Sequence, residues 1–171
     1  FGLIGSVMAI VGLVIPRLAL YLTQSQTPAK NLMILSFFTF LGLMGMAFFF
    51  PYFGVVPAMM LSAIIMMTHF FVSHYLNRIT PSHQRATTLS FKGLSFNLAY
   101  GGIGLIYSLL LRGLKASADN RPELTVDGLE SLVFRQSLGY FPWYFILMLL
   151  LLSIFAVVWL RRTDFSLKTL K

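Results

Sequence analysis

The chain has 171 residues, of which 57% are hydrophobic and 11% are charged, and its mean hydropathy is +0.81. Soluble domains are nearer half apolar and a quarter charged, so this composition excludes an ordinary soluble domain and favours a membrane protein. The net charge of +8 does not indicate nucleic-acid binding, because the basic residues are scattered at the ends of apolar runs, and the lack of cysteine excludes a disulfide framework and thiolate chemistry.

Five apolar runs are long enough to cross a bilayer as helices. A hydrocarbon core about 30 Å thick needs roughly 20 helical residues, whereas barrel strands would be about half as long. In chain order the runs cover residues 2–23, 32–50, 53–76, 89–111 and 140–160. The sequence therefore predicts an all-α, polytopic membrane helix bundle over residues 1–171, with a long loop at 112–139 and a polar tail at 161–171.

The chain begins at Phe1, already inside an apolar run. No basic segment precedes that run, so it does not have the pattern of a signal peptide. We therefore expect the chain to be a fragment of a longer protein.

Loop charge predicts the orientation. Taken alternately, the connections at 23–31 and 77–88 and the tail fall on one side, and the turn at 51–52 and the loop at 112–139 fall on the other. The long loop carries four of the five acidic residues. Lys and Arg are more frequent on the first side, and long loops weigh less in the positive-inside rule. We therefore expect the two short basic loops and the C-terminus in the cytoplasm.

The first two runs carry little that is polar. Gly2, Gly5, Ala9 and Gly12 follow each other at steps of three and four, so they share one helical face. Such a face favours close packing of two helices. Pro16 marks either a kink or the end of this helix. The second run is apolar all round past Thr39, which is typical of a helix that faces lipid or is fully packed.

The third run has one polar stripe. It consists of Ser62, Met66, His69 and Ser73, at steps of four, three and four. The stripe either lines a water-filled or substrate cavity, or makes hydrogen bonds between helices around a neutral histidine, and both alternatives stay open. His69 and His74 lie about 140° apart on a helix, so they cannot share a metal ion, and no metal site is predicted.

The loop at 77–88 is short, polar and basic. Thr80 can cap the next helix, with Pro81 at its first position. Arg85 then lies at the membrane surface, where it anchors the loop. Lys92 lies about one turn inside the membrane boundary, so it either extends to the headgroups or faces an inner vestibule.

The fourth run carries the strongest candidates for contact with a substrate. They are Asn97, Gly101, Gly104 and Ser108 on one face, flanked by Tyr100 and Tyr107. An asparagine in a membrane span is costly and therefore suggests a function. The alternative is close helix packing, with Asn97 bonded to a neighbour. We expect this face to lie against the Ser62–His69–Ser73 stripe.

The long loop and the fifth run complete the chain. Asp127 and Glu130 form a capping pattern, which predicts a short amphipathic helix near the outer surface before Pro142. Trp143 and Trp159 would be about 24 Å apart on a helix, which matches two aromatic belts. The residues between them are apolar, so this helix is predicted to face lipid.

The loop after the third run resembles a known family. The letters NRITPSHQRATTLS, followed by Asn97, Tyr100 and Gly101, resemble the loop between helices ten and eleven of bacterial major facilitator superfamily (MFS) transporters. The residues of this motif are Asn77, Arg78, Pro81, Arg85, Ala86, Thr87, Leu89 and Ser90, with Lys92 just beyond it. The loop at 23–31 departs from the family, because it lacks the basic run that often follows helix eight.

The resemblance implies both a fold and a function. The five runs would be helices eight to twelve of an MFS half bundle that lacks its first helix. Helices eight, ten and eleven would help to line the central cavity, and nine and twelve would be peripheral. The protein would be a multi-pass protein of the bacterial inner membrane, whose missing N-terminal half packs against this half.

We therefore expect part of a secondary transporter that moves a small solute by alternating access, with or without a coupled proton, and needs no cofactor. The five runs contain no Asp or Glu, so a carboxylate relay would lie elsewhere and His69 is the one titratable candidate within the membrane. One alternative is a polytopic membrane enzyme. It would need a cluster such as H-E-x-x-H, and only Ser73 and His69 share a face, so no enzyme activity is expected. The other is a stand-alone small structural or channel protein.

Overall fold

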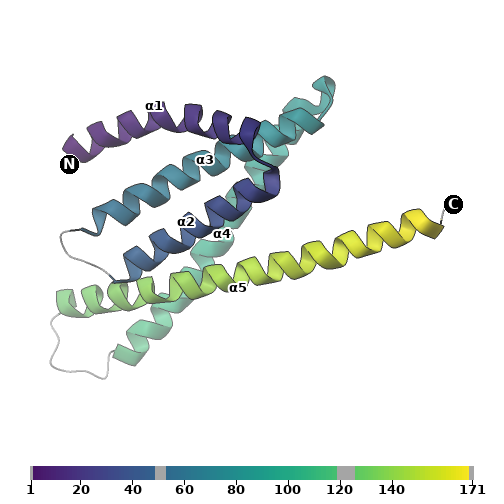
Figure 1. Cartoon of the computed structure of the whole chain (residues 1–171). Helices are drawn as coiled ribbons and strands as arrows, with labels where there is room; N and C mark the ends of the chain where they lie inside the picture. Colours follow the sequence, from purple (N-terminus) through teal and green to yellow (C-terminus); the bar gives the residue numbers. More distant parts are fainter. Residues whose placement is uncertain (1, 49–52, 119–125, 170–171) are drawn as a thin grey trace.

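The computed structural model describes residues 2–48, 53–118 and 126–169 (Figure 1). In these residues the elements are α1 (Gly2–Ser25), α2 (Pro28–Phe48), α3 (Val55–Ile79), the 3₁₀ turn η1 (Ser82–Gln84), α4 (Arg85–Ala118) and α5 (Val126–Thr169). Each of the five α-helices is long and apolar enough to cross a membrane. The predicted all-α membrane helix bundle is therefore confirmed. The predicted turn at 51–52 lies outside the described residues.

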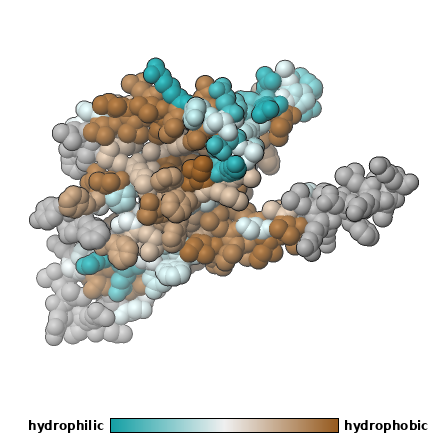
Figure 2. Space-filling model, in the orientation of Figure 1, coloured by the Kyte–Doolittle hydropathy of each residue, from teal (hydrophilic) through white to brown (hydrophobic). Residues whose placement is uncertain are grey.

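Four helices form a layer in the spatial order α1, α3, α2, α5, and α4 crosses behind it against α3 and α5 (Figure 1). The α1–α2 connection, η1 and the C-terminal end of α5 lie at one end of the bundle. This is the grouping of connections that five successive spans predict when the connections are taken alternately. Hydrophilic residues gather around the two connections at this end (Figure 2).

The core lies where α1, α2 and α3 meet. Ala19, Leu35, Ile64 and Phe71 form its buried cluster. At Gly45, a Cβ atom would lie only 2.9 Å from Cβ of Pro57, so a glycine is required for α2 and α3 to approach this closely. α2 lies between α3 and α5 in the described chain. Its apolar surface packs against these two helices on two sides and leaves Leu32, Met33 and Phe37 exposed.

The glycine face of α1 packs less than predicted. A Cβ atom at Gly12 would lie 3.5 Å from Cε of Met66, but Gly2 and Gly5 have no described neighbour within 4 Å. Instead, α1 buries Ile15 and Ala19, farther along the helix. The helix also continues through Pro16 to Ser25, so the proline does not end it.

The separate amphipathic helix predicted before Pro142 is wrong. It is the first part of α5, which is one continuous helix of 44 residues. At about 1.5 Å per residue such a helix is about twice as long as the bilayer core is thick. Pro142 is buried within it, together with Val133 and Ser137. In contrast, residues 150–159 are exposed, and the C-terminal end of α5 extends beyond the other helices (Figure 1).

Candidate functional site

The polar stripe of α3 is divided between two neighbouring helices. Met66 contacts α1 at Gly12, whereas His69 and Ser73 face α4. The hydroxyls of Ser62 and Ser73 donate to carbonyl oxygens of their own helix, at 2.9 and 2.8 Å. The stripe is therefore not a single cavity wall in the described chain, and its last two residues take part in helix packing.

Lys92 joins α4 to this part of α3. Its Nζ donates to Oγ of Ser73 at 2.6 Å and, more weakly, to the carbonyl oxygen of His69 at 3.5 Å. Nζ also lies 5.5 Å from the centre of the Phe96 ring, and that ring is 4.6 Å from the imidazole of His69. Lys92 is half-buried, so its side chain bonds to α3 instead of extending freely to the headgroups. We call Lys92, Ser73, His69 and Phe96 the α3–α4 contact.

The predicted polar face of α4 is open. Its members Asn97, Gly101, Gly104 and Ser108 are all exposed, as is the flanking Tyr100. A Cβ atom at Gly101 or Gly104 would meet no described atom within 4 Å. The expectation that this face lies against the α3 stripe is therefore wrong. Successive helical residues lie about 100° apart, so when Phe96 packs on α3, Asn97 points away from it.

Tyr107 lies on another side of α4, against α5. Its hydroxyl is 3.3 Å from Oγ of Ser137, which donates its own hydrogen to the carbonyl oxygen of Phe134 at 2.7 Å. The Tyr107 hydroxyl is therefore the donor to Ser137. Its ring also packs against Phe141 with the ring centres 5.7 Å apart. Tyr107 thus fixes the C-terminal half of α4 and does not belong to the open face.

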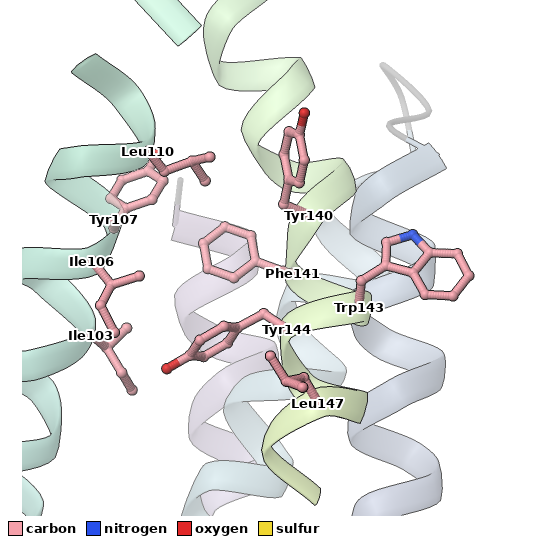
Figure 3. Close-up of a pocket in the computed structure, with 9 residues that line it drawn as sticks. All are labelled: Ile103, Ile106, Tyr107, Leu110, Tyr140, Phe141, Trp143, Tyr144 and Leu147. Carbon is pink, nitrogen blue, oxygen red and sulfur yellow. The ribbon is translucent and has the colours of Figure 1, made fainter. Parts of the chain in front are cut away.

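Next to Tyr107, α4 and α5 form an apolar cavity of about 340 Å³ that is open to the surface (Figure 3). It is lined by Ile103, Ile106, Tyr107 and Leu110 of α4 and by Tyr140, Phe141, Trp143, Tyr144 and Leu147 of α5. In the close-up, Phe141 points toward α4 and Trp143 away from it. Sequence reasoning assigned the α5 aromatics to an interfacial belt and missed this cavity. The signal for it was the four-residue spacing of Tyr140 and Tyr144, which places both rings on one face.

The polar, basic loop motif forms a compact connection between α3 and α4. The Thr80 backbone N–H donates to the carbonyl oxygen of Leu76, so Thr80 ends α3. It does not cap the next helix with its side chain as predicted, because η1 begins after Pro81 without a side-chain cap. Arg85 starts α4, and its Nε donates to the carbonyl oxygen of Thr80 at 3.3 Å. Asn77 is half-buried, and the other motif residues are exposed: Arg78, Pro81, Arg85, Ala86, Thr87, Leu89 and Ser90.

A buried asparagine at the start of α2 was missed. Asn31 is 1% exposed. Its Nδ2 donates to the carbonyl oxygen of Leu22 at 3.1 Å and to the hydroxyl of Tyr75 at 2.8 Å, so it joins α1, α2 and α3. Its Oδ1 has no partner among the described residues. A lone polar residue at the start of an apolar run looks like a loop residue, so the sequence offered no signal.

Acidic side chains are sparse in the described residues. No group of three His, Cys, Asp or Glu side chains there lies close enough to hold a metal ion. Among the described residues, one ion pair joins the exposed side chains of Lys115 and Glu130 at 3.6 Å. No family model, curated protein or solved structure matches the chain.

Proposed function

We propose that the chain is the C-terminal part of an MFS-type secondary transporter, which moves a small solute across the membrane by alternating access. The observation that carries this proposal is the open polar face of α4. Asn97 lies in the span Ser82–Ser117, which has a mean hydropathy of 1.5. None of the residues in the most apolar part of this span is buried. A carboxamide facing lipid has no partner for its hydrogen bonds, which is costly. The face is therefore expected to meet a second bundle or a solute path.

The way in which α4 is attached supports this function. It is held toward one end by the α3–α4 contact at Lys92 and Phe96, and toward the other by Tyr107 on α5. The stretch between these points contains the glycines of the open face, which meet no described neighbour. A helix that is held at two points, with glycines on its open face between them, is well suited to line a path and to bend during a transport cycle.

Beside the open face, α4 has an apolar side that we expect to contact lipid. Leu98 and Leu105 are 76% and 67% exposed. On a helix they lie about 80–100° from Asn97, at one edge of the open face. We assign the leucine side to lipid and the Asn97 side to the solute path and to the other half of the proposed transporter.

The rest of the proposal follows from the resemblance and the loop charges. The α3–α4 connection has the MFS-like motif, and the helices α1 to α5 would be helices eight to twelve of the transporter. The end of the bundle with the two hydrophilic connections would face the cytoplasm. The membrane would be a bacterial inner membrane.

Thiol labelling tests the proposal, since this chain has no cysteine of its own. Single cysteines would be placed at Asn97 and Gly101, and at Leu98 and Leu105 as matched controls, in the full-length protein without other accessible thiols. A water-soluble, charged thiol reagent should modify N97C and G101C and leave L98C and L105C largely unmodified. If N97C is as unreactive as L98C in intact membranes, the face is packed or in lipid and the proposal fails.

A further inference from the structure

Besides the open face at Asn97, the positive charge of Lys92 suggests a bound ligand. Its described partners are all neutral: Oγ of Ser73, the carbonyl oxygen of His69 and the Phe96 ring. An ammonium group has three N–H donors, and only the bond to Ser73 is short. No described carboxylate pairs with Lys92, since the ion pair in this part of the chain is Lys115–Glu130. The charge therefore lacks a counter-ion among the described residues, on a helix that is long and apolar enough to cross a membrane, where an unpaired charge is costly.

Beside Lys92, α3 and α4 form a crevice of about 270 Å³. Its walls are mostly apolar and contain Val72, Leu76, Phe91, Phe96, Thr88 and Ser95. The hydroxyl of Thr88 already donates to the carbonyl oxygen of Gln84 in η1 at 3.0 Å, and that of Ser95 donates to the carbonyl oxygen of Phe91 at 2.9 Å. Lys92 is thus the one charged group that lines the crevice. A ligand that matches it has one anionic group and a hydrocarbon part.

The position of the crevice indicates which ligand with an anionic group and a hydrocarbon part would bind there. Lys92 lies two helical turns, about 10 Å, beyond the start of α4 at Arg85. Arg78 and Arg85 are exposed at this end of the bundle, where hydrophilic residues gather (Figure 2). A group at this depth is within reach of phospholipid phosphates, and basic crevices between membrane helices bind acidic headgroups.

We infer that the crevice between α3 and α4 binds an anionic phospholipid. A phosphate oxygen accepts a hydrogen bond from Nζ of Lys92, and an acyl chain lies along Val72, Leu76 and Phe96. The lipid supplies the counter-charge that the described chain lacks and fills the space between the two helices. This site does not depend on the proposed transport function, because any protein with this α3–α4 contact would have it.

Native mass spectrometry of the full-length protein tests the site with phosphatidylglycerol and with neutral phosphatidylcholine of the same acyl chains. One charge near the membrane surface corresponds to about a fivefold change in affinity. Lys92→Gln should therefore weaken phosphatidylglycerol binding about fivefold, and Lys92→Arg should preserve it. Lys115→Gln is the matched control, since Lys115 is exposed near the other end of α4, and it should change nothing.

A second variant keeps the charge and blocks the space. Ser95→Leu adds bulk to the crevice wall and should reduce binding of the same lipid, which covers the case in which Lys92→Gln does not fold. Equal affinity for the two lipids, or full phosphatidylglycerol affinity in a folded Lys92→Gln protein or in Ser95→Leu, would overturn the inference. Displacement of the lipid by an equal concentration of inorganic phosphate would also overturn it, because the site would then serve a water-soluble anion.

Discussion

The carboxamide of Asn31 donates a hydrogen bond of 2.8 Å to the hydroxyl of Tyr75, 44 residues away. The same carboxamide bonds the carbonyl oxygen of Leu22 at the end of α1. One buried side chain therefore joins three helices at the end of the bundle where α1 passes into α2. Interhelical hydrogen bonds in membrane proteins contribute about 0.6 kcal/mol on average and rarely reach 2 kcal/mol.

We expect Tyr75→Phe to lower the free energy of unfolding by about 1 kcal/mol, because one Nδ2 hydrogen loses its acceptor while it stays buried. Thermal unfolding of the full-length protein in detergent would measure the change. Tyr21→Phe is the matched control, because Tyr21 is 64% exposed. Equal melting temperatures for Tyr75→Phe and the control would show that the Asn31–Tyr75 bond does not stabilise the bundle.

The contact between α2 and α3 makes a second prediction. At Gly45 an added methyl group would lie 2.9 Å from Cβ and 3.3 Å from Cγ of Pro57, and the proline ring cannot rotate away. Gly45→Ala should therefore destabilise the protein by about 1–3 kcal/mol. Gly113→Ala should be neutral or slightly stabilising, because no described atom lies within 4 Å and alanine favours the helix. The ratio of folded to aggregated protein after heating would compare them, and a stable Gly45→Ala protein would contradict the close approach.

The α3–α4 contact predicts that Ser73 contributes more to stability than Ser62, although both belong to the polar stripe of α3. Ser73 accepts a hydrogen bond from Lys92, whereas the described bond of Ser62 is to its own helix. Ser73→Ala should lower stability by about 1 kcal/mol and Ser62→Ala by much less. A double-mutant cycle of Ser73→Ala with Lys92→Gln would isolate the pairwise term. Strict additivity of the two changes would mean that the 2.6 Å contact does not contribute to stability.

The spans could be predicted from the sequence because hydrophobic length is a local property. The first predicted span ends at residue 23 and α1 ends at Ser25, and the third ends at residue 76 while α3 ends at Ile79. At α5, the predicted helix end before Pro142 was wrong. A proline often ends a helix, but here it is buried in a helix that continues on both sides of it.

The sequence did not allow us to predict which neighbouring helix packs against each face of α4. Both Lys92 and Asn97 are polar residues of α4, and the spacing of residues does not say which of them meets α3. That depends on how α4 crosses the layer, which is set by contacts distant in sequence such as Tyr107 with Ser137. The position of Asn31 was missed for the same reason, because its partner Tyr75 lies on another helix.

The most direct test of the central claim is the labelling of a cysteine at Asn97 from each side of the membrane. It would be done in sealed right-side-out and inverted vesicles that contain the full-length protein, with membrane-impermeant thiol reagents. Alternating access predicts that N97C reacts from both sides, and that a cross-link closing one side raises reactivity from the other. Reactivity from one side only, unchanged by such a cross-link, would contradict a transport path along α4.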